Sequence, residues 1–114
     1  MGKLKFTSSL KTNNDFHRVY RKGTSAVRPC LVVYARRAGG VSNRLGITVS
    51  TKVGKAHTRN RVRRRLREIY RLHEGDMRPG YDFVVVARIR AAKVTYQRLE
   101  KEFLSASQEL GAAL

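Results

Sequence analysis

Hydrophobic residues recur along this chain with two spacings, one typical of β-strands and the other typical of α-helices. Residues 44–51 alternate strictly, with Leu45, Ile47 and Val49 on one side, which predicts a strand that buries one face. The other side is small and polar, so it can stay open to solvent or accept a ligand closely. It consists of Gly46, Thr48 and Ser50. Runs rich in β-branched and aromatic residues predict further strands at residues 24–27, 30–37 and 81–88.

Three other segments have the spacing of amphipathic helices. On a helical wheel, residues 58–73 separate into an apolar side and a broad side of arginines. The apolar side is formed by Val62, Leu66, Ile69, Tyr70 and His73. A first helix is predicted over residues 13–21, with Thr12 or Asn13 as its cap and Gly23 at its end. A last helix is predicted after the cap residue Thr95, with a core-facing stripe of Tyr96, Leu99, Phe103, Leu104 and Leu110.

The order of these elements is a helix, two or three strands, a helix, a strand and a helix. This order predicts an α+β domain with one sheet and with helices packed mostly on one side of it. A length of 114 residues fits one domain, residues 1–114, with a small core. Residues 52–57, which are basic and include Gly54, are predicted to form the loop before the arginine-rich helix.

The net charge of +17 is concentrated in one part of the chain. Residues 1–67 contain eighteen lysines or arginines and one acid, whereas residues 68–114 contain seven of each sign. Residues 58–73 alone carry seven arginines and one acid, and such a helix repels itself unless an anion neutralises it. Because arginine binds phosphate through two donors and stacks on bases, the pattern predicts a nucleic-acid partner. Two alternatives fit less well. A surface that is merely solvated usually mixes positive and negative charges, and a helix that binds a membrane surface exposes large apolar residues.

Several other classes of function are disfavoured by composition. The single Cys30 cannot form an internal disulfide, and no apolar run is long enough to span a membrane. The basic N-terminus lacks the apolar stretch of a signal peptide, so we expect a soluble cytoplasmic protein. One cysteine and three scattered histidines offer no zinc cluster. Asp15 and Asp82 stand as isolated acids, and no catalytic triad, Cys-His pair or carboxylate pair is evident, which predicts a binder without catalytic side chains.

Aromatic residues near the basic segments give a second, weaker indication of nucleic-acid binding. Phe16 and Tyr20 share one face of the first predicted helix, and Tyr34 lies in the second predicted strand. Aromatic side chains beside basic groups can stack unpaired bases. Periodicity alone favours a core position for Phe16, whereas Tyr20 and Tyr34 suit a core or a stacking role equally.

Residues 49–68 read VSTKVGKAHTRNRVRRRLRE, which resembles the signature of the bacterial ribonuclease P protein subunit, V-S-K-K-x-G-x-A-x-x-R-N-R-x-K-R-x-x-R-E. The resemblance covers nearly the whole chain, and the Arg59-Asn60-Arg61 block is its most specific part. Further matches are Leu10-Lys11, Asp15-Phe16, Val19-Tyr20, Gly23, Leu45-Gly46 and residues 82–88. The departures are Thr51 and Arg63, where lysine is common, and His57, where an apolar residue is common. Thr51 removes one possible phosphate contact.

The resemblance implies an α-β-β-β-α-β-α fold with a single mixed sheet, similar to the second domain of ribosomal protein S5. It also implies a left-handed crossover through the arginine-rich helix, although parallel crossovers are almost always right-handed. The implied function is that of a ribonucleoprotein subunit, in an enzyme that removes the 5′ leader from precursor tRNA to give the mature 5′ end. The chemistry would lie on the ribonuclease P RNA, which would hold the Mg²⁺ and bind the protein one to one.

The resemblance also assigns roles to individual residues by position. The implied contacts to the single-stranded leader are Phe16, Tyr20, Tyr34, Ser50, Arg59 and Asn60. The implied contacts to the RNA subunit are Lys55, Arg61, Arg64, Arg65 and Arg67. No catalytic residue or metal ligand is assigned to the protein itself.

Three other functions fit the sequence less well. A ribosomal or ribosome-assembly protein would share the charge and the sheet, but it does not account for the Arg59-Asn60-Arg61 context. A nucleoid-type DNA binder would need a dimer interface or a groove-reading helix, and no heptad or exposed apolar patch suggests one. A protein-only nuclease would need a cluster of carboxylates for metal, whereas the acids here are scattered.

Overall fold

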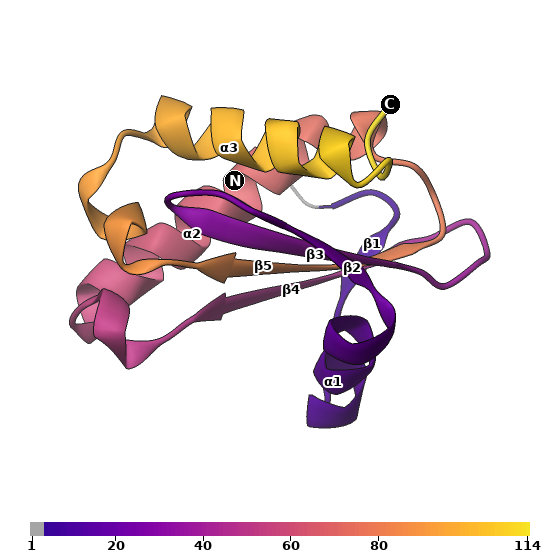
Figure 1. The fold of residues 1–114 in the computed structure, drawn as a ribbon, viewed down its shortest axis with the longest axis horizontal. Helices are drawn as coiled ribbons and strands as arrows, with labels where there is room; N and C mark the ends of the chain where they lie inside the picture. The colour runs from indigo at the N-terminus through magenta and orange to yellow at the C-terminus, as the bar shows by residue number, and fades with distance from the viewer. Residues whose placement is uncertain (1–3) are drawn as a thin grey trace.

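The computed structural model describes residues 4–114, so the first three residues of the predicted domain lie outside the described part. Helices and one sheet confirm the α+β class (Figure 1). In chain order, the described strands and α-helices are β1 (Thr7–Ser9), α1 (Asn13–Lys22), β2 (Thr24–Val27), β3 (Leu31–Arg37), β4 (Asn43–Val49), α2 (Ala56–His73), β5 (Tyr81–Ala87) and α3 (Tyr96–Glu109). Short 3-10 helices lie at Thr51–Val53, Glu74–Asp76 and Ile89–Lys93.

The sheet is mixed, and its five strands have the order β1-β4-β5-β3-β2. The central strands β4 and β5 run parallel, with Leu45 beside Phe83, whereas β3 is antiparallel to both β5 and β2. The strand β1, which was not predicted, pairs in parallel with the outer edge of β4. It has only three residues, with the sequence TSS, so it lacks both the length and the apolar alternation that identify a strand in a sequence.

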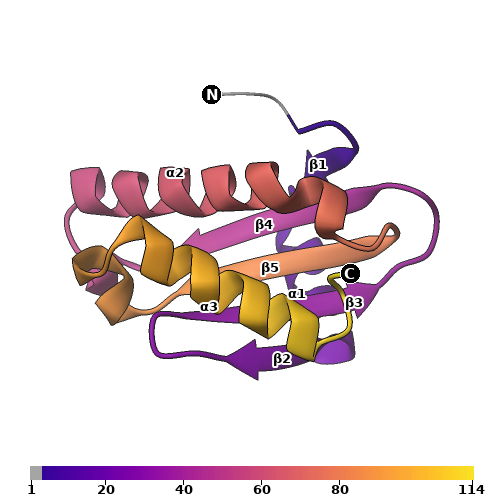
Figure 2. The same cartoon turned by 90° about the horizontal axis from the view of Figure 1, so that it is seen from above.

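The helices lie on both faces of this sheet. Helices α2 and α3 lie side by side on one face, and α1 packs against one end of the other face (Figures 1 and 2). The prediction of helices mostly on one side therefore holds for α2 and α3, while α1 is the exception. The connection from β4 through α2 to β5 is left-handed, as the family resemblance implied (Figure 2).

The main core lies between the sheet and the pair α2 and α3. Tyr70 of α2 is fully buried and packs edge-on against Phe83 and Phe103, with ring centroids 5.8 and 6.2 Å away. The predicted apolar side of α2 is confirmed for Val62, Leu66, Ile69 and Tyr70, which are all buried. His73 differs, because its ring leaves the core and its Nε2 lies 2.8 Å from a carboxylate oxygen of Glu100 on α3.

Two predicted boundaries are wrong where β4 gives way to α2. The strand ends at Val49 rather than at Thr51, because Thr51–Val53 forms a 3-10 turn. The helix begins at Ala56, two residues before the predicted start. Gly54 lies between them with φ +155, in a backbone conformation that L side chains rarely adopt, so the short connection depends on glycine.

A buried carboxylate holds the N-terminal segment against α2. Glu74 is 3% exposed and accepts hydrogen bonds from the backbone N–H groups of Lys5 at 2.8 Å and Phe6 at 3.1 Å. The Thr7 hydroxyl donates to the same carboxylate at 2.6 Å and lies 2.9 Å from the Tyr70 hydroxyl. These contacts explain why β1 forms despite its polar sequence.

None of the helices in residues 4–114 combines the length and the apolar character that crossing a membrane requires.

Candidate nucleic-acid interface

Helix α2 supplies the basic side of the candidate interface. Its apolar stripe faces the core, so its arginines are left on the outer surface and on the two flanks. No acid lies in its first turn, and the N-terminal end of the helix dipole adds positive potential there. The N-cap position is Lys55, one of the residues assigned to the RNA subunit.

Five of the seven arginines of α2 line two hollows on its flanks. Arg63 and Arg67 line a hollow of about 200 Å³ together with Phe16 of α1 and Gly46 of β4. On the other flank, a hollow of about 550 Å³ is lined by Arg61, Arg64, Arg65, Glu68 and Tyr96. The family resemblance assigned Arg67 to the RNA subunit together with Arg61, Arg64 and Arg65. The structure places Arg67 in the other hollow, beside Phe16.

The aromatic residues assigned to the leader come together between α1 and the sheet. The rings of Tyr20 and Tyr34 meet edge to face, with centroids 4.8 Å apart, and the Tyr20 hydroxyl lies 3.4 Å from the Thr48 hydroxyl. Phe16 packs over Gly46, so closely that a Cβ on this glycine would lie 2.5 Å from the ring. Phe16 is therefore a packing residue of α1, as periodicity favoured, and it also borders the smaller hollow.

The sheet face that was predicted to be open is only partly open. Gly46 is buried under α1, whereas Thr48 is half-buried and Ser50 is exposed beyond the end of β4. Helix α1 covers only one end of this face (Figure 1), and the half-buried Thr48 lies beside Tyr20 of α1.

The remaining leader residues lie at the start of α2. The Arg59 Nε donates a hydrogen bond to the Gly54 carbonyl at 3.1 Å, which holds this side chain against the preceding turn. Asn60 is exposed, and its side-chain oxygen accepts a hydrogen bond from Arg63 at 3.3 Å. The structure thus places Ser50 and Arg59 at the turn between β4 and α2, while Asn60 points its side-chain oxygen toward Arg63 on the same helix.

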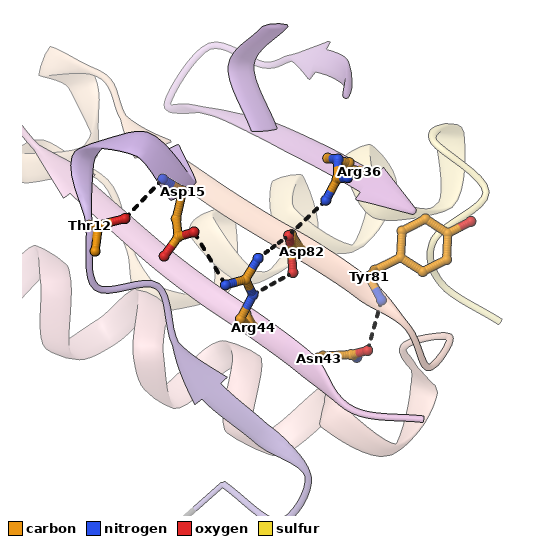
Figure 3. Close-up of polar contacts among 7 residues, drawn as sticks. All are labelled: Thr12, Asp15, Arg36, Asn43, Arg44, Tyr81 and Asp82. Atoms are coloured by element: carbon orange, nitrogen blue, oxygen red, sulfur yellow. Dashed lines mark hydrogen bonds and ion pairs between the residues drawn. The ribbon is translucent and has the colours of Figure 1, made fainter. Parts of the chain in front are cut away.

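An ion-pair network beneath α1 was missed at the sequence level (Figure 3). Asp82 is 2% exposed and accepts hydrogen bonds from Arg44 Nε at 3.0 Å and Nη2 at 2.8 Å. Arg36 donates to the same carboxylate at 3.4 Å, and Arg44 also forms an ion pair of 3.4 Å with Asp15 of α1. The prediction that Asp15 and Asp82 are isolated acids is therefore wrong. Arg36, Arg44 and Asp82 lie on the same face of three neighbouring strands. The sequence does not show that they are neighbours, because this depends on the register of the strands.

This network joins α1 to the sheet and neutralises its own charges. The hydrogen bond to Asp82 raises the pKa of Arg44 above its usual value. The hydrogen bond with Thr12 lowers the pKa of Asp15, and Arg44 acts in the same direction. Two arginines and two aspartates thus cancel within the protein, so Arg36 and Arg44 add little to the net positive charge of the surface.

Within residues 4–114, no group of three or more His, Cys, Asp or Glu side chains is arranged to hold a metal ion. Asp15 and Asp82 are both paired with arginines. The described residues therefore offer no site built from protein ligands alone for a metal ion.

Comparison with known proteins gives consistent matches. A family model described as Ribonuclease P matches residues 4–111. The ribonuclease P protein component of Clostridioides difficile strain 630 is 44% identical over 96 residues, which cover 83% of this chain and 84% of the relative. The solved structure of the Staphylococcus aureus RNase P protein aligns with a TM-score of 0.83 and 30% identity, over 93% of this chain and 97% of that one. The RNase P protein from Thermotoga maritima aligns with a TM-score of 0.78 and 32% identity, over 86% and 93% of the two chains.

Proposed function

The chain belongs to the ribonuclease P protein family, and we propose that it binds the catalytic RNA and the single-stranded 5′ leader of precursor tRNA. Membership makes it a protein subunit of a tRNA-processing endonuclease. The proposal of RNA and leader binding rests on one observation, which is that the arginine-rich surface of α2 lies next to the aromatic residues of α1. Arg63 and Arg67 of the arginine-rich helix share a hollow with Phe16 of α1, the helix that also carries Tyr20, so one protein can hold two RNA segments next to each other.

The cleft between α1 and the sheet binds the leader in this proposal. Tyr20 and Tyr34 offer aromatic surface to unpaired bases, and Thr48 and Ser50 offer hydroxyl groups. Arg59 and Asn60 bind the leader farther along, at the start of α2. A duplex presents stacked bases and would leave the aromatic surface unused, so the ligand is single-stranded.

The rest of α2 binds the RNA subunit, through Lys55, Arg61, Arg64, Arg65 and Arg67. Arg61, Arg64 and Arg65 face one flank, away from the leader cleft. Arg67 faces the hollow beside Phe16, so it lies where the leader and the RNA subunit approach each other. In this arrangement one protein serves one RNA subunit.

The side chains of the protein position RNA and do not carry out the cleavage. The acids near the cleft are paired with arginines, and the described residues hold no carboxylate cluster. We assign the cleavage step, and the Mg²⁺ that supports it, to the RNA subunit. The protein contributes binding, orientation and positive charge.

The test is cleavage of precursor tRNA at low Mg²⁺ with the RNA subunit alone, the protein alone and both together. Cleavage only with both components is the expected result at low Mg²⁺, and it shows that the protein and the RNA subunit act together. If the protein adds nothing to a matched RNA subunit, the binding proposal fails. Cleavage by the protein alone would overturn the assignment of the chemistry to RNA.

A further inference from the structure

The larger hollow beside α2 includes an aromatic side chain, which a site that bound only phosphate would not need. This hollow of about 550 Å³ lies where α2 meets the first residue of α3, Tyr96. Its walls include Arg61, Arg64 and Arg65. It is separate from the leader cleft, because Arg63 and Arg67 line the hollow on the opposite flank of the helix.

Two of the wall arginines are held in place by the protein backbone. Arg61 donates a hydrogen bond from Nη2 to the Ala92 carbonyl at 3.1 Å. Arg65 donates from Nη1 to the Val94 carbonyl at 3.4 Å. Because each guanidinium group has five N–H donors, most of them remain free after these contacts. The two side chains are thus positioned before any ligand arrives.

The floor of the hollow is aromatic and positioned by the core. Tyr96 is half-buried and packs against the main core cluster. Its hydroxyl is buried and has no hydrogen-bond partner among the residues that the structure describes. The neighbouring Glu68 carboxylate accepts a hydrogen bond from Arg71 Nε at 3.0 Å, so its charge is balanced within α2. Glu100, which also lies near Tyr96, is in contact with His73. What remains for a ligand is an aromatic surface beside three arginines.

We propose that this hollow binds an unpaired base of the RNA subunit, stacked on the Tyr96 ring, with the flanking phosphates on Arg61, Arg64 and Arg65. The inference rests on the proposed function and deepens it by naming the RNA element that α2 recognises. Arginines alone would serve any duplex backbone, whereas an aromatic ring among them is useful only to a base that has left the stack. Guanidinium groups also stack on bases, so the walls suit the same ligand.

The variants Tyr96→Leu and Tyr96→Phe separate this role from packing. Leucine keeps apolar bulk but removes the aromatic face, so affinity for full-length ribonuclease P RNA should fall about 5- to 100-fold at fixed salt and Mg²⁺. Phenylalanine keeps the ring and removes only the unpartnered hydroxyl, so it should bind like the parent protein. Tyr81→Leu is the matched control, because Tyr81 is a half-buried tyrosine of β5 outside this hollow. Thermal unfolding of each variant shows that the compared proteins are folded.

A photoreactive phenylalanine analogue at position 96 gives a second, direct measurement. We expect it to crosslink to a nucleotide that is unpaired in the RNA subunit. Crosslinks confined to duplex nucleotides, or equal affinities for Tyr96→Leu and Tyr96→Phe, would overturn the inference. The variant Arg64→Ala distinguishes a failure of the base site from a failure of the proposed function. If it weakens RNA binding while Tyr96→Leu does not, the proposed function stands and the base site fails. If the parent protein does not bind this RNA, the proposed function itself fails.

Discussion

Glu74 holds the N-terminal segment in place through a single buried carboxylate. Burial acts to raise its pKa, but hydrogen bonds from Thr7, Lys5 and Phe6 outweigh this effect and leave the pKa below its usual value. In Glu74→Gln, a side-chain N–H₂ group faces donors that the carboxylate accepted. We expect the free energy of unfolding at pH 7 to fall by about 1–3 kcal/mol in urea titrations.

The pH dependence of Glu74→Gln has a defined sign. A carboxylate whose pKa is depressed in the folded state stabilises that state above its unfolded pKa of about 4.3. This stabilisation is lost as the pH falls through the folded pKa, so the difference between parent and variant should narrow below about pH 4. Glu109→Gln is the control, because Glu109 is an exposed partner of Arg28, and it should leave the unfolding midpoint unchanged. A gap that stays constant down to pH 3 would show that the charge of Glu74 is not the cause.

The substitution Tyr34→Ala tests the assignment of the cleft to the leader. The Tyr34 ring meets Tyr20 on the partly open face of the sheet, so Tyr34→Ala removes one stacking surface and one support of the other tyrosine. Affinity for precursor tRNA with a leader should fall about 5- to 150-fold in the holoenzyme, whereas affinity for mature tRNA should not change. Equal losses for both ligands would contradict the assignment of the cleft to the leader.

At the scale of elements, the position of α1 depends on the absence of a side chain at Gly46. An added Cβ would lie 2.5 Å from the Phe16 ring and 3.1 Å from a methyl group of Leu10. In Gly46→Ala the ring must therefore move away from β4. We expect a stability loss of about 1–3 kcal/mol and a weaker affinity for substrates with a leader. Chemical denaturation and holoenzyme binding assays measure the two effects.

Gly75→Ala is the matched control for this steric effect. A Cβ at Gly75 would meet no atom within 4 Å, and the residue lies far from the leader cleft in the turn after α2. The change should leave leader affinity unaltered, and stability should stay the same or rise by about 0.4–1 kcal/mol. If both alanine variants lower leader affinity alike, the spacing of α1 is not what Gly46 controls.

The elements that could be predicted from the sequence are those with local signals. The periodic apolar stripe of α2 identified its buried residues, and Thr95 was correctly expected to cap α3, where its side chain accepts a hydrogen bond from the Arg98 N–H. The strand β1 could not be predicted, because it depends on a carboxylate 67 residues away at Glu74. The link from Asp82 to Arg44 was hidden for the same reason, since only the pairing of β4 with β5 makes them neighbours. Tyr20 and Tyr34 were predicted as possible stacking residues because they are aromatic. Their contact with each other could not be predicted, because it depends on how α1 packs against β3.

At the scale of the whole molecule, the charge of +17 sets how binding responds to salt. Each phosphate contact that is lost should lower the slope of log K against log salt by about 0.7 to 0.9. Arg64→Ala and Arg61→Ala should therefore weaken RNA-subunit binding and flatten its salt dependence. Arg78→Ala removes the same charge at a hollow lined by Arg37 and Tyr81, outside the proposed RNA surface, so its slope should stay near that of the parent protein. Equal slopes for all three variants would indicate a diffuse charge effect without a defined site.

The same charge predicts how the protein alters the Mg²⁺ requirement of its RNA partner. The leader and the RNA subunit are both polyanions, and the proposed sites hold them on adjoining surfaces that meet at Phe16, Arg63 and Arg67. Positive charge between two RNAs lowers their mutual repulsion, which Mg²⁺ must otherwise screen. The Mg²⁺ concentration for half-maximal cleavage should thus fall when the protein is added. It should fall less with Arg67→Ala than with Arg78→Ala, because only Arg67 lies between the two RNA sites. An unchanged requirement would mean that the protein acts through binding and orientation alone.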